Sequence, residues 1–98
     1  MNKIMTFKLV SGEEIIAKVV DETEYTYIVS SPRTLSLHQT QDGRVSAGFV
    51  PSLILGNDEE LYLAKSAIVM YNTNVQKEYE DRYLEVVSGL TLASSLKG

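Results

Sequence analysis

The side chains that could carry catalysis or hold a metal are few in this chain of 98 residues. His38 is its one histidine and cysteine is absent, so a zinc site, which is built mainly from these two residue types, is not expected. Glu13 and Glu14 are adjacent carboxylates, but their position beside a turn signal predicts exposed turn residues rather than a catalytic pair. Without a glycine-rich phosphate loop or a recognisable Ser/His/Asp set, the sequence predicts a protein that is not an enzyme and uses no cofactor.

Composition and charge narrow the class of protein and of partner. A hydrophobic content of 44% and a charged content of 22% are ordinary for one globular domain. The formal net charge of −4 counts against a broad basic face for duplex nucleic acid, because phosphate neutralisation dominates that kind of binding. No apolar stretch reaches signal-peptide length at the N-terminus or the roughly 20 residues of a membrane span. A cytoplasmic protein that does not contact membranes is expected.

An alternation of apolar and polar residues predicts a hairpin near the N-terminus. Residues 4–10 and 14–21 both have the period of two that is typical of half-buried strands, and Ile15 and Val19 share one face of the second. Gly12 lies between them and can take the positive φ of a tight turn. The hairpin therefore predicts the first two strands of a sheet.

The same period continues downstream, which predicts three further strands. A third strand starts at Thr26 and is expected to be interrupted near Pro32, because proline lacks the ladder donor. Asp42 and Gly43 form the strongest turn signal and precede a fourth strand over residues 45–55. Residues 61–71 predict a fifth strand region, with a break near Lys65 and Ser66.

The period changes after residue 72 and predicts a C-terminal helix. Thr73 and Gln76 fit a capping box at its start. Apolar residues recur at spacings of three and four, namely Val75, Tyr79, Tyr83, Val86 or Val87, and Leu90. The expected organisation is a β-barrel over residues 1–72, an amphipathic helix over 73–90 packed on the barrel or on a neighbour, and a flexible tail over 91–98. Gly89 is expected to end the helix. The fold class is mainly β, a small and strongly bent five-stranded barrel with a C-terminal helix.

Two of the predicted strands are apolar on both faces. Residues 67–71 carry no polar side chain that would face water, and residues 50–55 carry one, Ser52. A free edge of this kind is an association hazard in a monomer. Either the C-terminal helix covers the outer face, or the last two strands pair with neighbouring subunits and close a ring; the two explanations are compatible. We expect a closed homo-oligomer.

The order of these parts resembles the Sm-like family, which includes the Lsm proteins and Hfq. The first family motif matches Gly12, Ile15, Ala17 and Val19, and Lys65-Ser66 precedes the last apolar strand much as a basic pair does in the family. The resemblance covers about residues 5–72 and is strongest to the divergent Sm-like proteins of phages of marine bacteria. Another SH3-like small barrel is the alternative fold.

This chain also departs from the family pattern. Sm-like proteins usually begin with a helix, whereas this chain opens on a strand. The aspartate and asparagine that follow the second strand in the family fall near Thr23 and Tyr27, so neither is retained.

The resemblance implies a ring that binds single-stranded RNA, or DNA, around its pore and acts in nucleic-acid processing. The matching positions are Thr23, Tyr25, Tyr27, Lys65 and Ser66. A tyrosine would stack on a base, Lys65 would contact phosphate or stack as a cation, and Ser66 would donate a hydrogen bond.

Each of these residues also has a structural interpretation. Tyrosines pack well in strands, and Lys65 can extend its stem along a strand end towards water. The acidic residues 58–60 would weaken phosphate binding if they faced the pore, although a solvated turn is the simpler explanation for them. The alternative function is a structural or protein-interaction ring, encoded by a phage, that binds no nucleic acid.

Overall fold

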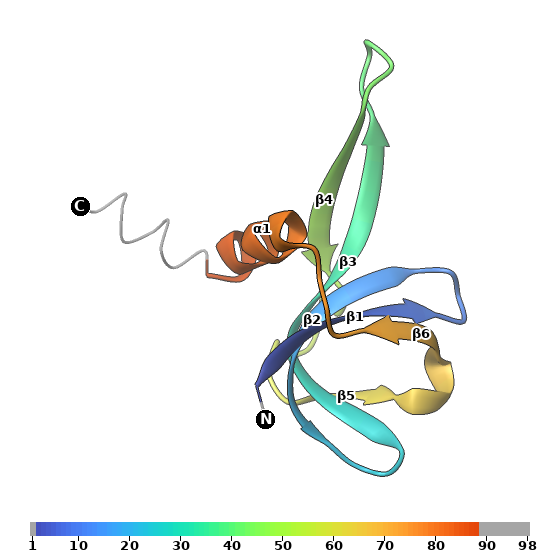
Figure 1. Cartoon of the computed structure of the whole chain (residues 1–98), viewed down its shortest axis with the longest axis vertical. Coiled ribbons are helices and arrows are strands. Elements are labelled where there is room, and N and C mark those ends of the chain that lie inside the picture. Colours follow the sequence, from blue (N-terminus) through green and yellow to red (C-terminus); the bar gives the residue numbers. More distant parts are fainter. Residues whose placement is uncertain (1, 89–98) are drawn as a thin grey trace, which may run out of the picture.

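One antiparallel sheet of six strands, followed by one helix, makes up the part of the chain that the computed structural model describes, residues 2–88 (Figure 1). The elements are β1 (Lys3–Leu9), β2 (Glu14–Glu22), β3 (Thr26–Gln39), β4 (Val45–Pro51), β5 (Leu61–Ala64), the 3₁₀ turn η1 (Lys65–Ala67), β6 (Ile68–Asn72) and α1 (Lys77–Val87). The predicted mainly-β fold with a C-terminal helix is confirmed. Within residues 2–88, no helix has the length and apolar character needed to cross a membrane.

The predicted β1–β2 hairpin is confirmed. Phe7 lies opposite Ile15 in the antiparallel ladder, and Gly12 has a φ of 92° in the turn. The Gly12 amide donates a 2.8 Å hydrogen bond to the Leu9 carbonyl, which closes the turn. Other residues adopt this backbone region only with strain, so the glycine fixes the position of the turn.

A kink at Ser31 divides β3 into two halves with different partners. The strand continues through Pro32, so the predicted interruption is a change of direction and not a break. Ser31 has a φ of 52°, and its amide donates to the Asp58 carbonyl rather than to a strand. As a result, β5 pairs with the first half of β3 and β4 pairs with the second half.

The sheet is strongly bent but open. Its order is β4-β3-β2-β1-β6, and β5 pairs with β3. Only η1 separates β5 from β6, so the chain passes from a neighbour of β3 to the far side of β1 in three residues. No ladder joins β5 to β6 in the described residues, so the predicted strongly bent barrel of five strands is corrected to a bent, open sheet of six strands. The break near Lys65 is confirmed, because η1 lies there.

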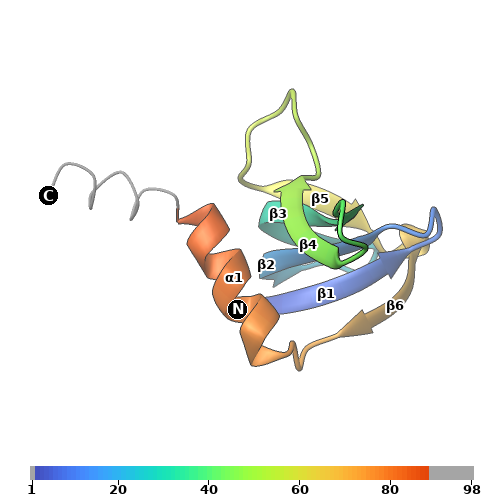
Figure 2. The ribbon, with the colours of Figure 1, turned by 90° about the horizontal axis from the view of Figure 1, so that it is seen from above.

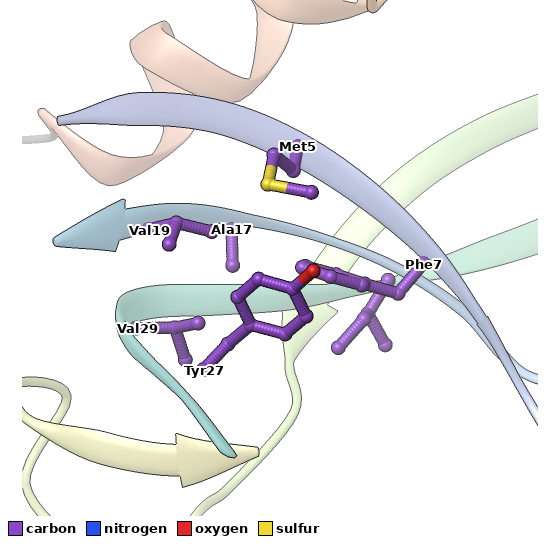
Figure 3. Packing of buried hydrophobic residues seen from close by; sticks show 7 residues of the cluster. Met5, Phe7, Ala17, Val19, Tyr27 and Val29 are labelled. Carbon is purple, nitrogen blue, oxygen red and sulfur yellow. The ribbon is translucent and has the colours of Figure 1, made fainter. Parts of the chain in front are cut away.

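The hydrophobic core lies inside the bend of the sheet (Figure 3). It is formed by the inward residues of the first three strands: Met5, Phe7, Ile15, Ala17, Val19, Tyr27 and Val29. The rings of Phe7 and Tyr27 tilt against each other with their centroids 5.3 Å apart. Ala17 and Val19 have no exposed surface, as their period-two pattern predicted.

Helix α1 packs beside the sheet near the kink of β3 (Figure 2). The Tyr83 side chain is its buried anchor, and Arg82 Nη1 donates a 3.0 Å hydrogen bond to the Ala47 carbonyl of β4. The predicted start at Thr73 is wrong. The Asn72 side chain accepts a hydrogen bond from the Asn74 amide, which turns the chain, and the helix begins at Lys77 without a side-chain cap. Gly89, Leu90 and the tail 91–98 lie outside the described residues.

Two apolar surfaces are left exposed by this packing. On β6, the side chains of Val69, Met70 and Tyr71 remain 60–67% exposed. The predicted fourth strand over 45–55 is too long, because β4 ends at Pro51, and Leu55 in the following loop is fully exposed. The ladder between β3 and β4 ends at the pair of Arg33 and Pro51, next to the kink at Ser31. Beyond this pair, β3 changes direction and no longer runs alongside β4.

Candidate nucleic-acid interface

Four of the five predicted site residues flank one contact between the β2–β3 turn and η1. The Lys65 amide donates a 2.8 Å hydrogen bond to the Tyr25 carbonyl. Tyr25 and Thr23 belong to the turn that follows β2, while Lys65 and Ser66 belong to η1. Figure 1 shows this turn and η1 at the same end of the bent sheet. Segments about forty positions apart in the sequence therefore meet in space.

Thr23 shapes the turn. Its hydroxyl oxygen accepts a hydrogen bond of 3.0 Å from the Thr26 amide and lies 2.6 Å from the Thr26 hydroxyl. Its own amide donates to the Thr26 carbonyl at 2.8 Å. These bonds close the short turn and hold the adjacent Tyr25 side chain out towards solvent.

The two tyrosines at the site have different environments. The Tyr25 side chain is 73% exposed, whereas Tyr27 is 7% exposed. The Tyr27 ring packs against Phe7 and lies 6.3 Å from the Tyr71 ring, centroid to centroid. Burial, with the nearby Glu22 carboxylate, raises the pKa of Tyr27. Tyr25 therefore offers an accessible ring for base stacking, and Tyr27 supports the site from within the core.

Lys65 carries the positive charge of the site, and that charge is already paired. Its Nζ lies 2.6 Å from Glu22 Oε2 and 5.0 Å from the centroid of the Tyr27 ring. Both partners of the ion pair are partly exposed, so solvent and salt weaken their attraction. Ser66 follows on η1 and is exposed. The acidic residue Asp58 pairs with Arg33 at 2.9 Å, beside the kink of β3.

Sequence reasoning did not identify Glu22 and Tyr71 as neighbours of this site. Glu22 is the last residue of β2. Its position beside the predicted loop was the one feature of the sequence that pointed to it. Tyr71 lies on β6, and its approach to Tyr27 depends on the bend of the sheet. In residues 2–88 no group of three His, Asp or Glu side chains is arranged to hold a metal ion.

No protein-family model matches this chain, and no curated protein matches it significantly. The case for a function therefore comes from the geometry of the candidate site. Three groups lie at one end of the sheet: the exposed ring of Tyr25, the amine of Lys65, which its ion pair with Glu22 holds in place, and the exposed hydroxyl of Ser66. Such a set can stack on a base, contact a phosphate and donate a hydrogen bond.

Proposed function

We propose that this chain is a subunit of a closed homo-oligomeric Sm-like ring that binds single-stranded RNA, or DNA, and acts in nucleic-acid processing. The observation that carries the proposal is the hydrogen bond from the Lys65 amide to the Tyr25 carbonyl. It brings the two segments of the proposed site together and leaves the Tyr25 ring exposed.

The strand arrangement supports the Sm-like assignment. The strands β4 and β5 both pair with β3, so together they take the place of one bent fourth strand, and β6 takes the place of the fifth. Ile15, Ala17 and Val19, the apolar members of the first motif, face the core. Lys65 and Ser66 lie in the turn that joins these last two strands.

Exposed strand edges support the ring. β6 pairs with β1 and β5 pairs with β3, so each of the two strands presents its other edge to solvent in the described chain. Val69, Met70 and Tyr71 on β6, and Tyr62 on β5, are all at least 60% exposed. Pairing β5 of one subunit with β6 of the next would satisfy both edges and bury these side chains.

The proposed binding energy comes from stacking and from repetition. A base stacked on an aromatic side chain contributes roughly 1–3 kcal/mol. Each subunit would supply one Tyr25 ring and one Lys65 amine, and a ring repeats this set around its axis. An acidic protein can in this way present a local site for a single strand without a basic face.

A fluorescence-anisotropy titration of labelled oligo-U and oligo-A at low salt tests the RNA-binding proposal. Lys65→Ala is expected to weaken binding several-fold and to reduce its salt dependence. Lys77→Ala is the matched control, because it removes the same charge from the exposed start of α1. Tyr25→Ala is expected to weaken binding about tenfold, and Tyr25→Phe to preserve it. No binding at low salt, or binding unchanged by Lys65→Ala, would exclude RNA binding at this site.

The second candidate is a structural or protein-interaction ring that binds no nucleic acid. The observation that favours it is the 2.6 Å ion pair of Lys65 with Glu22, which offsets the positive charge of the site. The formal net charge of −4 also opposes the binding of phosphate and so favours this candidate. An oligomer that fails to bind either oligonucleotide at low salt would support this candidate over the first.

A further inference from the structure

An exposed aliphatic loop and an apolar groove lie on different surfaces of this chain. The loop follows β4, and its side chains Leu53, Ile54 and Leu55 are 49%, 84% and 100% exposed. Three consecutive large aliphatic residues at a loop tip are unusual on the surface of a protein without a partner.

The groove has a volume of about 350 Å³. It lies between the start of α1 and the hairpin of β3 and β4, and its apolar lining includes Ile16, Leu35, Phe49, Val75 and Tyr79. For comparison, an apolar cavity of about 150 Å³ accommodates a benzene molecule. The groove is therefore large enough to take an aliphatic side chain. Its lining also contains polar residues, namely Thr6, Glu14, Asn72, Asn74 and Gln76.

We infer that the loop carrying Leu53, Ile54 and Leu55 inserts into this groove on the next subunit of the ring. The inference rests on the ring assembly proposed above and names a second contact within it. The occupant of the groove is thus another copy of this chain. Because loop and groove are different surfaces, the contact is head-to-tail, and contacts of this type form a ring when the rotation from one subunit to the next closes.

The strand edges determine which parts of two subunits would meet. Every ladder of the described sheet is antiparallel, so we take the pairing of β5 with a neighbour's β6 to be antiparallel as well. In an antiparallel pair, the residues that precede one strand approach the residues that follow the other. The aliphatic loop precedes β5, and residues 73–76, which border the groove, follow β6.

The absence of cysteine from the chain allows a direct test by disulfide cross-linking. In the double variant Leu55→Cys/Gln76→Cys, one cysteine lies in the exposed loop and the other in the lining of the groove. Mild oxidation is expected to give a ladder of covalent multimers that a reductant reverses. Each single variant is expected to give no ladder, because two identical sites do not meet in a head-to-tail contact.

The matched control is Leu55→Cys/Val86→Cys. Gln76 precedes the first residue of α1, whereas Val86 lies near the end of this helix. The two residues are ten positions apart, which corresponds to about 15 Å along the helix axis. It is 40% exposed and is expected not to cross-link to the loop. Equal cross-linking of the two double variants in a protein that light scattering shows to be oligomeric would overturn the loop contact and leave the ring intact. A mass near 10.9 kDa for the unmodified protein would overturn both.

A second measurement uses a substitution that leaves the folded subunit unperturbed. Leu55 is fully exposed, so Leu55→Ser is expected to keep the circular dichroism spectrum of the folded subunit. It is expected to weaken subunit association at least tenfold, because a buried leucine is lost from each contact. Val86→Ser is expected to leave association unchanged. Equal association of Leu55→Ser and the unmodified protein would contradict the inference.

Discussion

The buried hydroxyl of Tyr83 donates a 2.8 Å hydrogen bond to the main-chain carbonyl of Ser31, 52 positions earlier in the chain. On the other side of Ser31, its amide donates to the Asp58 carbonyl at 2.6 Å. A single residue of β3 therefore connects the C-terminal helix to the loop between β4 and β5. The kinked backbone of Ser31, with a φ of 52°, is what points these two groups at partners outside the ladder.

We predict that Tyr83→Phe lowers the free energy of unfolding by about 1–2 kcal/mol. The substitution keeps the packed ring but leaves the Ser31 carbonyl without this donor, and an unsatisfied buried acceptor costs about that much. Urea denaturation followed by circular dichroism would measure it. Tyr25→Phe, on an exposed side chain, is the control and is expected to change stability by less than about 0.5 kcal/mol. Equal effects of the two substitutions would show that the hydroxyl of Tyr83 does not hold the helix.

Alkaline pH is expected to destabilise the protein through the same tyrosine. Burial raises the pKa of Tyr83 from 10.0 to about 12, with the Arg33 guanidinium acting in the opposite direction. Between these two values the unfolded chain loses the phenolic proton while the folded chain keeps it. The contribution of this group is therefore complete below pH 10 and is lost as the pH rises towards 12, with a slope of at most about 1.4 kcal/mol per pH unit.

Urea titrations at pH 9, 10 and 11 would test this dependence. Tyr27, whose pKa is also raised, contributes in the same direction, so part of the slope is expected to persist in Tyr83→Phe. A slope that is identical in the unmodified protein and in Tyr83→Phe would show that Tyr83 ionises normally.

Ser31 is expected to tolerate glycine and to reject a β-branched residue. Glycine adopts a positive φ without strain, although it loses more freedom on folding. We predict that Ser31→Gly changes the free energy of unfolding by less than about 1 kcal/mol, and that Ser31→Val lowers it by about 1–2 kcal/mol. Thermal unfolding of both variants would measure the difference. Equal stability of the two would mean that the kink at Ser31 is not maintained in solution.

Local patterns in the sequence predicted the parts of the fold that depend on neighbouring residues. The hairpin at Gly12, the period-two core of β1 and β2 and the break at Lys65 depend on backbone preferences and on alternation over a few residues. The helix start was missed because the capping pattern of Thr73 competes with the Asn72 side chain, one residue earlier, which accepts a hydrogen bond from the Asn74 amide. Sequence alone does not say which of two adjacent polar side chains turns the chain.

The details of the candidate site could not be predicted, because they depend on contacts between distant segments. The ion pair of Lys65 with Glu22 joins residues 43 positions apart, and the burial of Tyr27 depends on the bend that brings Tyr71 near. Tyr25 and Tyr27 lie on either side of Thr26, the predicted start of the third strand, and the sequence offered either ring for stacking. Only the sheet determines which one faces the core and which one faces solvent.

We predict that Glu22→Gln strengthens the binding of single-stranded RNA about two- to fivefold at low salt. The substitution removes the carboxylate that lies 2.6 Å from Lys65 Nζ and frees the amine for a phosphate. Glu24→Gln is the matched control, because it removes one negative charge from the neighbouring turn. Anisotropy titrations of oligo-U over a range of salt concentrations would measure both. An equal gain in the two variants would indicate that net charge, rather than Lys65, limits binding.

The exposed strand β6 gives the last prediction, which concerns assembly. Val69 is 62% exposed on this edge strand, so a lysine there is tolerated by the isolated subunit but would be buried in a contact between strands. We predict that Val69→Lys reduces the mass measured by light scattering at micromolar concentration to that of a single chain, 10.9 kDa. Val86→Lys adds the same charge on α1 and is expected to leave the oligomer intact. If Val69→Lys retained the full mass of the oligomer, the subunits would have to associate through a surface other than β6.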